Sequence, residues 1–99
     1  MYETMDDLVA SVQKRLYRMR DLADDMAAVT ARESAPDDSI TAEVDGNGAL
    51  LNLEFSQAVS KMTPEQFEQA LLAATHGAAR RAFTARGELI TAFNEEVAE

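Results

Sequence analysis

Two clusters of cationic side chains are the residues of this chain whose spacing best suits binding chemistry. Residues 14–20 and residues 80–86 carry lysine and arginine with no acid among them. Cations repeated along a helix can contact successive phosphates of a nucleic-acid backbone. Arg18 and Arg20 also have aspartates three and four residues further on, a spacing typical of ordinary surface ion pairs. The candidate DNA contacts are Lys14, Arg15, Arg18, Arg80 and Arg81.

The charge of the whole chain opposes binding to a polyanion. The formal net charge is −9 and the sequence pI is about 4.4, so the chain repels nucleic acid at long range. The two basic clusters are the exception to an otherwise acidic sequence. Arg86 is a weaker candidate than its neighbours because its projected position falls inside the apolar arc of the predicted helix.

Residues suited to catalysis or metal binding are few. His76 is the only histidine, and without cysteine the chain has no zinc-type ligand cluster. The paired acids Asp24-Asp25, Asp37-Asp38 and Glu95-Glu96 have no nucleophile, phosphate loop or EF-hand spacing near them, which favours solvated surface charge. We therefore expect no enzyme activity, no cofactor, no metal and no small-molecule substrate.

A first helix is predicted from about Met5 to Ala27. Thr4 and Asp7 have the spacing of a capping box, and Asp6 and Asp7 favour the positive end of the helix dipole. Apolar residues then recur with helical period and form one continuous face. This face includes Met5, Leu8, Val9, Val12, Leu16, Met19, Leu22, Ala23 and Met26.

A three-stranded antiparallel meander is predicted next. Residues 29–34 suggest a short first strand, and residues 40–44 alternate apolar and polar side chains. Asp45-Gly46-Asn47-Gly48 supplies residues that tolerate positive φ at a hairpin turn. Residues 51–55 resume the alternation, so the meander has one apolar face.

A long second helix is predicted from Thr63-Pro64 to about Val97. Thr63 is a capping residue, and proline suits the first helical position. The apolar arc covers about half of the helix circumference, and the length of roughly 50 Å exceeds a compact domain of this size. The helix either breaks at Gly87 or projects and packs on a second copy, and we favour a two-fold homodimer, with a kink near Gly87 compatible with it. The predicted dimer contacts are Phe83, Leu89, Ile90 and Phe93.

Length and composition define a single domain spanning residues 1–99. The N-terminus is acidic and lacks the basic segment and apolar run of a signal peptide, and no stretch has the length of a membrane span. We therefore expect a cytosolic protein that binds no membrane. Oligomerisation is a common way for so short a chain to bury additional apolar surface.

The order helix, short strand, hairpin and long alanine-rich helix resembles the YbaB/EbfC nucleoid-associated family over about residues 5–95. The segment Ser39-Ile-Thr-Ala-Glu-Val-Asp-Gly-Asn-Gly48 is similar to the family's strand and Asn/Asp-Gly turn, and Leu51-Asn-Leu-Glu-Phe55 to its next strand. Gly77-Ala-Ala-Arg-Arg81 is similar to a segment of the family's helix. Two segments depart from the family pattern: Ala35-Pro36-Asp37-Asp38 stands in place of a glycine-rich segment, and His76-Gly77 in place of Asn-Asp.

The resemblance implies an α+β homodimer with paired helical arms, located in the cytoplasm at the nucleoid. It implies binding to duplex DNA through backbone contacts with little sequence preference. The alternative hypothesis is a non-catalytic protein-binding scaffold that does not bind DNA, because some relatives resemble accessory proteins of type VII secretion systems. The acidic charge of the chain keeps this alternative open.

Overall fold

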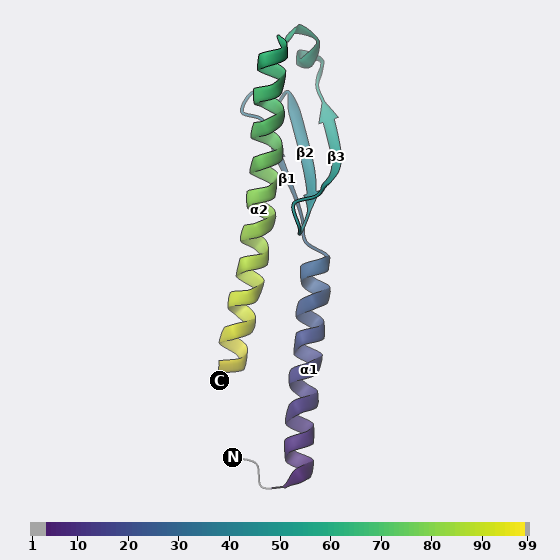
Figure 1. Ribbon diagram of the computed structural model, residues 1–99, viewed down its shortest axis with the longest axis vertical. Coiled ribbons are helices and arrows are strands. Elements are labelled where there is room, and N and C mark those ends of the chain that lie inside the picture. The colour runs from purple at the N-terminus through teal and green to yellow at the C-terminus, as the bar shows by residue number, and fades with distance from the viewer. Residues whose placement is uncertain (1–3, 99) are drawn as a thin grey trace.

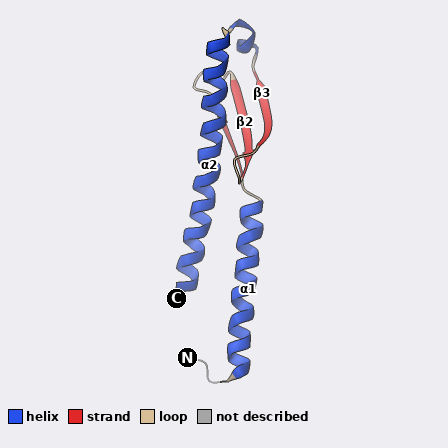
Figure 2. Cartoon of the chain, viewed as in Figure 1, coloured by secondary structure: helices blue, strands red, loops and turns tan. Residues whose placement is uncertain are grey.

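The computed structural model describes residues 4–98, and the side chains of residues 4–96. One long helix packs along a small sheet, a second long helix extends beyond the end of the sheet, and the chain is strongly elongated (Figure 1). Helices and strands follow the predicted order, so the predicted α+β class is confirmed (Figure 2). The elements are α1 (Met5–Ala27), β1 (Thr30–Ser34), β2 (Ile40–Asp45), β3 (Leu50–Phe55), the short 3-10 helix η1 (Gln57–Lys61) and α2 (Pro64–Ala98).

Side-chain caps fix the starts of both helices. The Asp7 amide donates to Thr4 Oγ1 over 3.1 Å at the start of α1. At the start of α2, the Gln66 amide donates to Thr63 Oγ1 over 3.1 Å, while Gln66 Oε1 accepts from the Thr63 amide over 3.0 Å. This reciprocal pair is a capping box and satisfies amides that the first turn leaves without helical partners.

The three strands pair antiparallel in the order β1-β2-β3, as predicted. Asp45 closes the hairpin, because its carboxylate accepts hydrogen bonds from the amides of Asn47 and Ala49, both over 2.9 Å. Gly48 has φ of +82°, a conformation that glycine adopts without strain. The register shifts between Glu43 and Val44, so that β3 holds one extra residue and bulges.

The core is a close contact between α2 and β2. Ile40, Ala42 and Val44 point from β2 toward the helix and are buried. They meet a row of alanines spaced by one helical turn, and the small side chains allow the helix to lie directly on the sheet. The buried alanines of α2 are Ala70, Ala74, Ala78 and Ala82.

The molecule measures 71 × 18 × 14 Å, and its radius of gyration is 20.4 Å, against about 13 Å for a compact chain of this length. Helix α1 lies beyond the end of the sheet, antiparallel to the second half of α2 (Figure 1). Helix α2 continues through Gly87 as a single helix, so it projects rather than breaks. The kink near Gly87 and the homodimer stay predictions.

Two glycines of α2 allow a matched test of this packing. A Cβ on Gly77 would lie 2.6 Å from Glu33 Cγ, whereas a Cβ on Gly87 would meet nothing within 4 Å. Gly87→Ala should therefore raise the free energy of unfolding by about 0.5–1 kcal/mol through helix propensity. Gly77→Ala should lower it by about 1 kcal/mol, because the Glu33 side chain must be displaced from α2. Urea unfolding followed by circular dichroism measures both values, and equal stabilisation by the two variants would contradict the close approach.

Candidate nucleic-acid interface

The first basic cluster lies on the projecting helix α1. Between residues 8 and 20 this helix carries four cations and no acid, and none of its residues is fully buried. Lys14 and Arg15 are exposed near the C-terminal end of α2. Arg18 is half-buried, and its Nε atom lies 4.0 Å from Glu96. Projected along the helix, these three side chains share one half of the circumference, while Arg20 points the other way and lies 6.0 Å from the Tyr17 ring.

The second basic cluster lies on α2, and the fold uses two of its three arginines. Arg81 Nη1 donates to the Arg32 carbonyl over 2.9 Å and lies 3.5 Å from Glu33 Oε2. The Ala35 amide donates to Ile40 across the same pair of strands, so the Arg32 carbonyl points to the free edge of β1. Arg81 therefore caps an edge strand as well as carrying charge. Arg80 is exposed and forms no ion pair with the side chains described over residues 4–96.

Arg86 connects α2 to the β2–β3 hairpin through hydrogen bonds. Its Nη1 atom donates to the Gly46 carbonyl over 3.0 Å and to Asn47 Oδ1 over 3.3 Å. A Cβ on Gly46 would lie 2.9 Å from the Met26 carbonyl oxygen, so the turn, the end of α1 and α2 meet at this point. The position of Arg86 inside the apolar arc is thus explained by a structural role.

Arg32 is a cation outside both clusters, and the sequence did not single it out. Its guanidinium lies 2.9 Å from Glu54 and 3.8 Å from Glu43 on the outer face of the sheet. The hydrogen bond to Glu54, and the charges of Glu54 and Glu43, raise the pKa of Arg32 above its ordinary value. Two carboxylates thus neutralise Arg32, which makes it a poor phosphate contact.

The two basic clusters do not come together within one chain. Arg18 lies level with Glu96, and Arg80 lies sixteen residues further up α2, which corresponds to about 24 Å along the axis. The two basic clusters therefore form separate surfaces at two different heights along the molecule.

The predicted dimer contacts occupy two different environments. Phe83 and Ile90 are 52% and 41% exposed. Leu89 and Phe93 are half-buried and line a small gap of about 170 Å³ together with Leu22 of α1. Phe93 is therefore partly covered by α1 of the same chain.

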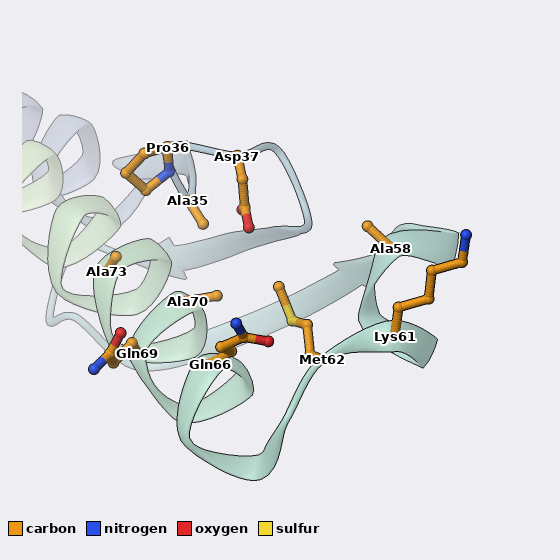
Figure 3. A pocket seen from close by; sticks show the side chains of 10 residues that line it. All are labelled: Ala35, Pro36, Asp37, Ala58, Lys61, Met62, Gln66, Gln69, Ala70 and Ala73. Carbon is orange, nitrogen blue, oxygen red and sulfur yellow. The ribbon is translucent and has the colours of Figure 1, made fainter.

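A cleft of about 580 Å³ lies at the other end of the molecule, between the loop at residues 35–37, η1 and the first turns of α2 (Figure 3). Met62 points into it, and the Lys61 ammonium group lies at its rim. Asp37 accepts hydrogen bonds from the amide and hydroxyl groups of Ser39, which lower the pKa of its carboxyl group. No pattern in the sequence predicts this cleft, because its walls come from three separate segments.

Over the described residues, no group of three or more histidine, cysteine or acidic side chains is placed to hold a metal ion. None of the described helices is long and apolar enough to span a membrane.

The comparisons place this chain within a family. The sequence model of the YbaB/EbfC DNA-binding family matches residues 1–96, and the chain belongs to that family. The fold is similar to the crystal structure of the uncharacterized protein HP0035 from Helicobacter pylori, with a TM-score of 0.66 and 15% sequence identity. That similarity covers 95% of this chain and 98% of the other. No curated protein matches the chain.

The free energy of unfolding distinguishes the structural role of Arg86 from the exposed position of Arg80. Arg86→Ala should lower the free energy of unfolding by about 1–2 kcal/mol, because it removes two hydrogen bonds that join α2 to the hairpin. Arg80→Ala removes an exposed charge from the same helix and should change stability by less than about 0.5 kcal/mol. Chemical denaturation of both variants provides the comparison. Equal effects would argue against a structural role for Arg86.

Proposed function

We propose that this protein is a nucleoid-associated homodimer that binds duplex DNA through the phosphate backbone with little sequence preference. Membership of a DNA-binding family supports a DNA ligand. The observation that carries the proposal is the stretch of α1 from residue 8 to residue 20, which holds four cations and no acid on a projecting helix. Lys14, Arg15 and Arg80 are the leading contacts, with Arg18 and Arg81 joining them.

Screening explains how a chain of net charge −9 can bind a polyanion. The Debye length is about 8 Å at physiological ionic strength. The sheet begins thirteen residues or more beyond Lys14, which corresponds to roughly 20 Å along α1. Acids of the sheet are therefore largely screened at Lys14, and the acids that act on the cluster at short range are those near Arg18, such as Glu96 and Asp21.

The ion pairs of Arg18 and Arg81 present little obstacle to phosphate contact. Arg18 and Glu96 have side chains 33% and 61% exposed, and pairs of this kind contribute at most about 1 kcal/mol. A DNA phosphate can replace such a carboxylate at small cost. Phosphate contacts carry no sequence information, and no element of the described chain has the form of a base-reading motif.

A second copy of the chain accounts for the apolar side chains left in water. Large apolar residues stay more than a third exposed on α1, β3 and α2, which is unusual for a monomeric protein. Two-fold pairing would bury them and double each basic cluster. The exposed residues are Met5, Leu8, Val9, Val12, Leu16, Tyr17, Met19, Leu50, Leu51, Phe55, Leu72, Phe83 and Ile90.

The salt dependence of DNA affinity tests the proposed ligand. The logarithm of the association constant for a non-specific duplex should fall linearly with the logarithm of salt concentration, with a slope of about −0.9 per phosphate contacted. Lys14→Glu should make this slope shallower by about 2 units per dimer, because two copies each lose a contact. Lys61→Glu is the matched control at the opposite end of the molecule and should leave the slope unchanged. Identical slopes for both variants would remove Lys14 from the interface.

Sedimentation at micromolar concentration tests the homodimer. Ile90→Glu places a charge on the exposed apolar side of α2 and should shift the protein toward monomer, because the carboxylate would be desolvated at the interface. Thr91→Glu adds the same charge one residue further on, at an exposed position away from that side, and should leave the dimer intact. A wild-type monomer would contradict the homodimer.

The second candidate is a non-catalytic protein-binding scaffold, favoured by the apolar stripe on α1 and the acidic surface. It differs from the first candidate in one measurable respect. Under this alternative, duplex DNA does not bind even at low salt, where electrostatic attraction is strongest. A pull-down at moderate salt would then retain a protein partner while DNA is lost.

A further inference from the structure

Two oppositely charged segments lie beside each other where α1 and α2 run antiparallel (Figure 1). Residues 8–20 of α1 hold four cations and no acid, whereas residues 87–98 of α2 hold three acids and no cation. The C-terminal end of a helix is the negative end of its dipole, and the last turn of α2 carries no basic residue that would offset it. The cations of α1 therefore lie close to a negative surface of their own chain.

Arg18 forms an ion pair across these two segments. Its side chain is 33% exposed, and its Nε atom lies 4.0 Å from Glu96 Oε1. Arg18 and Glu96 line the small gap between the helices, together with Asp21 and Asp25 of α1. The two aspartates belong to the same helix as Arg18 and keep their places relative to it. Glu96 differs from them, because its contact with Arg18 depends on α2 staying beside α1.

Lys14 lies on the same side of α1 as Arg18 but has a different environment. It precedes Arg18 by four residues, which places it about 6 Å nearer the tip of α1 and about 40° away around the helix. Helix α1 extends past the C-terminal end of α2 (Figure 1). Lys14 is exposed, whereas Arg18 is half-buried beside a carboxylate. Neighbouring cations of one cluster are therefore not equally accessible to a phosphate.

We propose that Glu96 competes with DNA phosphate for the Arg18 guanidinium, so that the C-terminal end of α2 restrains DNA binding by its own chain. This inference rests on the proposed DNA binding and names a regulation of that site. Carboxylate and phosphate bind a guanidinium through the same N–H donors, and two anions beside one guanidinium repel each other. Phosphate binds Arg18 fully only when Glu96 moves away, which breaks a contact between α1 and α2.

The exposure of the pair sets the size of the restraint. Ion pairs that are open to solvent change an equilibrium constant by at most about fivefold. Glu96 therefore weakens DNA binding without blocking it, and two copies that contact one duplex would multiply the factor. Because dissolved salt screens exposed charges, the restraint is largest at low ionic strength.

Removal of the carboxylate tests the competition. Glu96→Gln should strengthen binding to a non-specific duplex by about two- to fivefold per contacting copy, measured by fluorescence anisotropy at low salt. Glu95→Gln is the matched control, because it removes the same charge at an exposed position about 100° around the helix from Glu96. Its smaller gain measures the general influence of one negative charge. Equal gains from the two variants would overturn the competition.

A double-mutant cycle determines whether Glu96 acts through Arg18. In an Arg18→Gln background, Glu96→Gln should have no larger effect than Glu95→Gln, because the guanidinium for which the anions compete is absent. An undiminished gain in that background would contradict the inference. Urea unfolding of the wild type, both single variants and the Arg18–Glu96 double variant measures the pair without DNA. Zero coupling in the free protein would also overturn the inference, because a contact that contributes nothing cannot compete.

The same titrations separate the failure of this inference from that of the proposed function. A wild-type protein that binds no duplex at low salt, with Glu96→Gln equally inactive, would overturn both the DNA binding and the competition. Duplex binding with equal responses at positions 95 and 96 would overturn the competition alone and leave the DNA binding intact. Circular dichroism of each variant verifies that the helices are retained.

Discussion

The contact between the alanine row of α2 and the central strand β2 governs the rest of this structure. Four alanines spaced by one turn bring the helix close to the sheet, with Ile40 and Val44 as the only large side chains buried on the strand side. Small side chains pack closely but remove little apolar area from water, at about 25 cal/mol per Å². The core of a single copy is consequently thin, and much of the apolar surface stays outside it.

The arginines show how the fold divides one residue type between two roles. Arg81 and Arg86 join segments 40 or more residues apart in the sequence, and both donate to backbone carbonyls. Arg32 is held between two glutamates on the sheet. The cations of α1 lie beyond the end of the sheet, on a helix without fully buried residues. The arginines that join segments therefore lie on α2 and the sheet, whereas the exposed cations lie on α1 and, in the case of Arg80, beside Arg81 on α2.

Local signals sufficed to predict the two long helices and the three strands, although not η1 (Gln57–Lys61), while contacts between distant elements could not be predicted. The capping pair of Thr63 and Gln66, and the turn at Asp45, act within a few residues, so composition and spacing indicate them. That Arg81 reaches the Arg32 carbonyl depends on the placement of β1 beside α2, which no local pattern specifies. The half-burial of Phe93 could not be predicted for the same reason, because the residues that cover it belong to α1, far away in the sequence. The width of the apolar arc on α2 did indicate that one sheet would not cover it.

The connection between α1 and the sheet is so short that a small rotation of α1 there produces a large displacement at the far end of the helix. Only two residues link the helix to β1, and the Gly46 turn bears directly on the last turn of α1. A rigid helix of about 34 Å converts a rotation of about 10° at this connection into a displacement of about 6 Å at its tip. The basic residues lie partway along this helix. A small rotation at this connection therefore changes where the cations of α1 lie relative to the sheet.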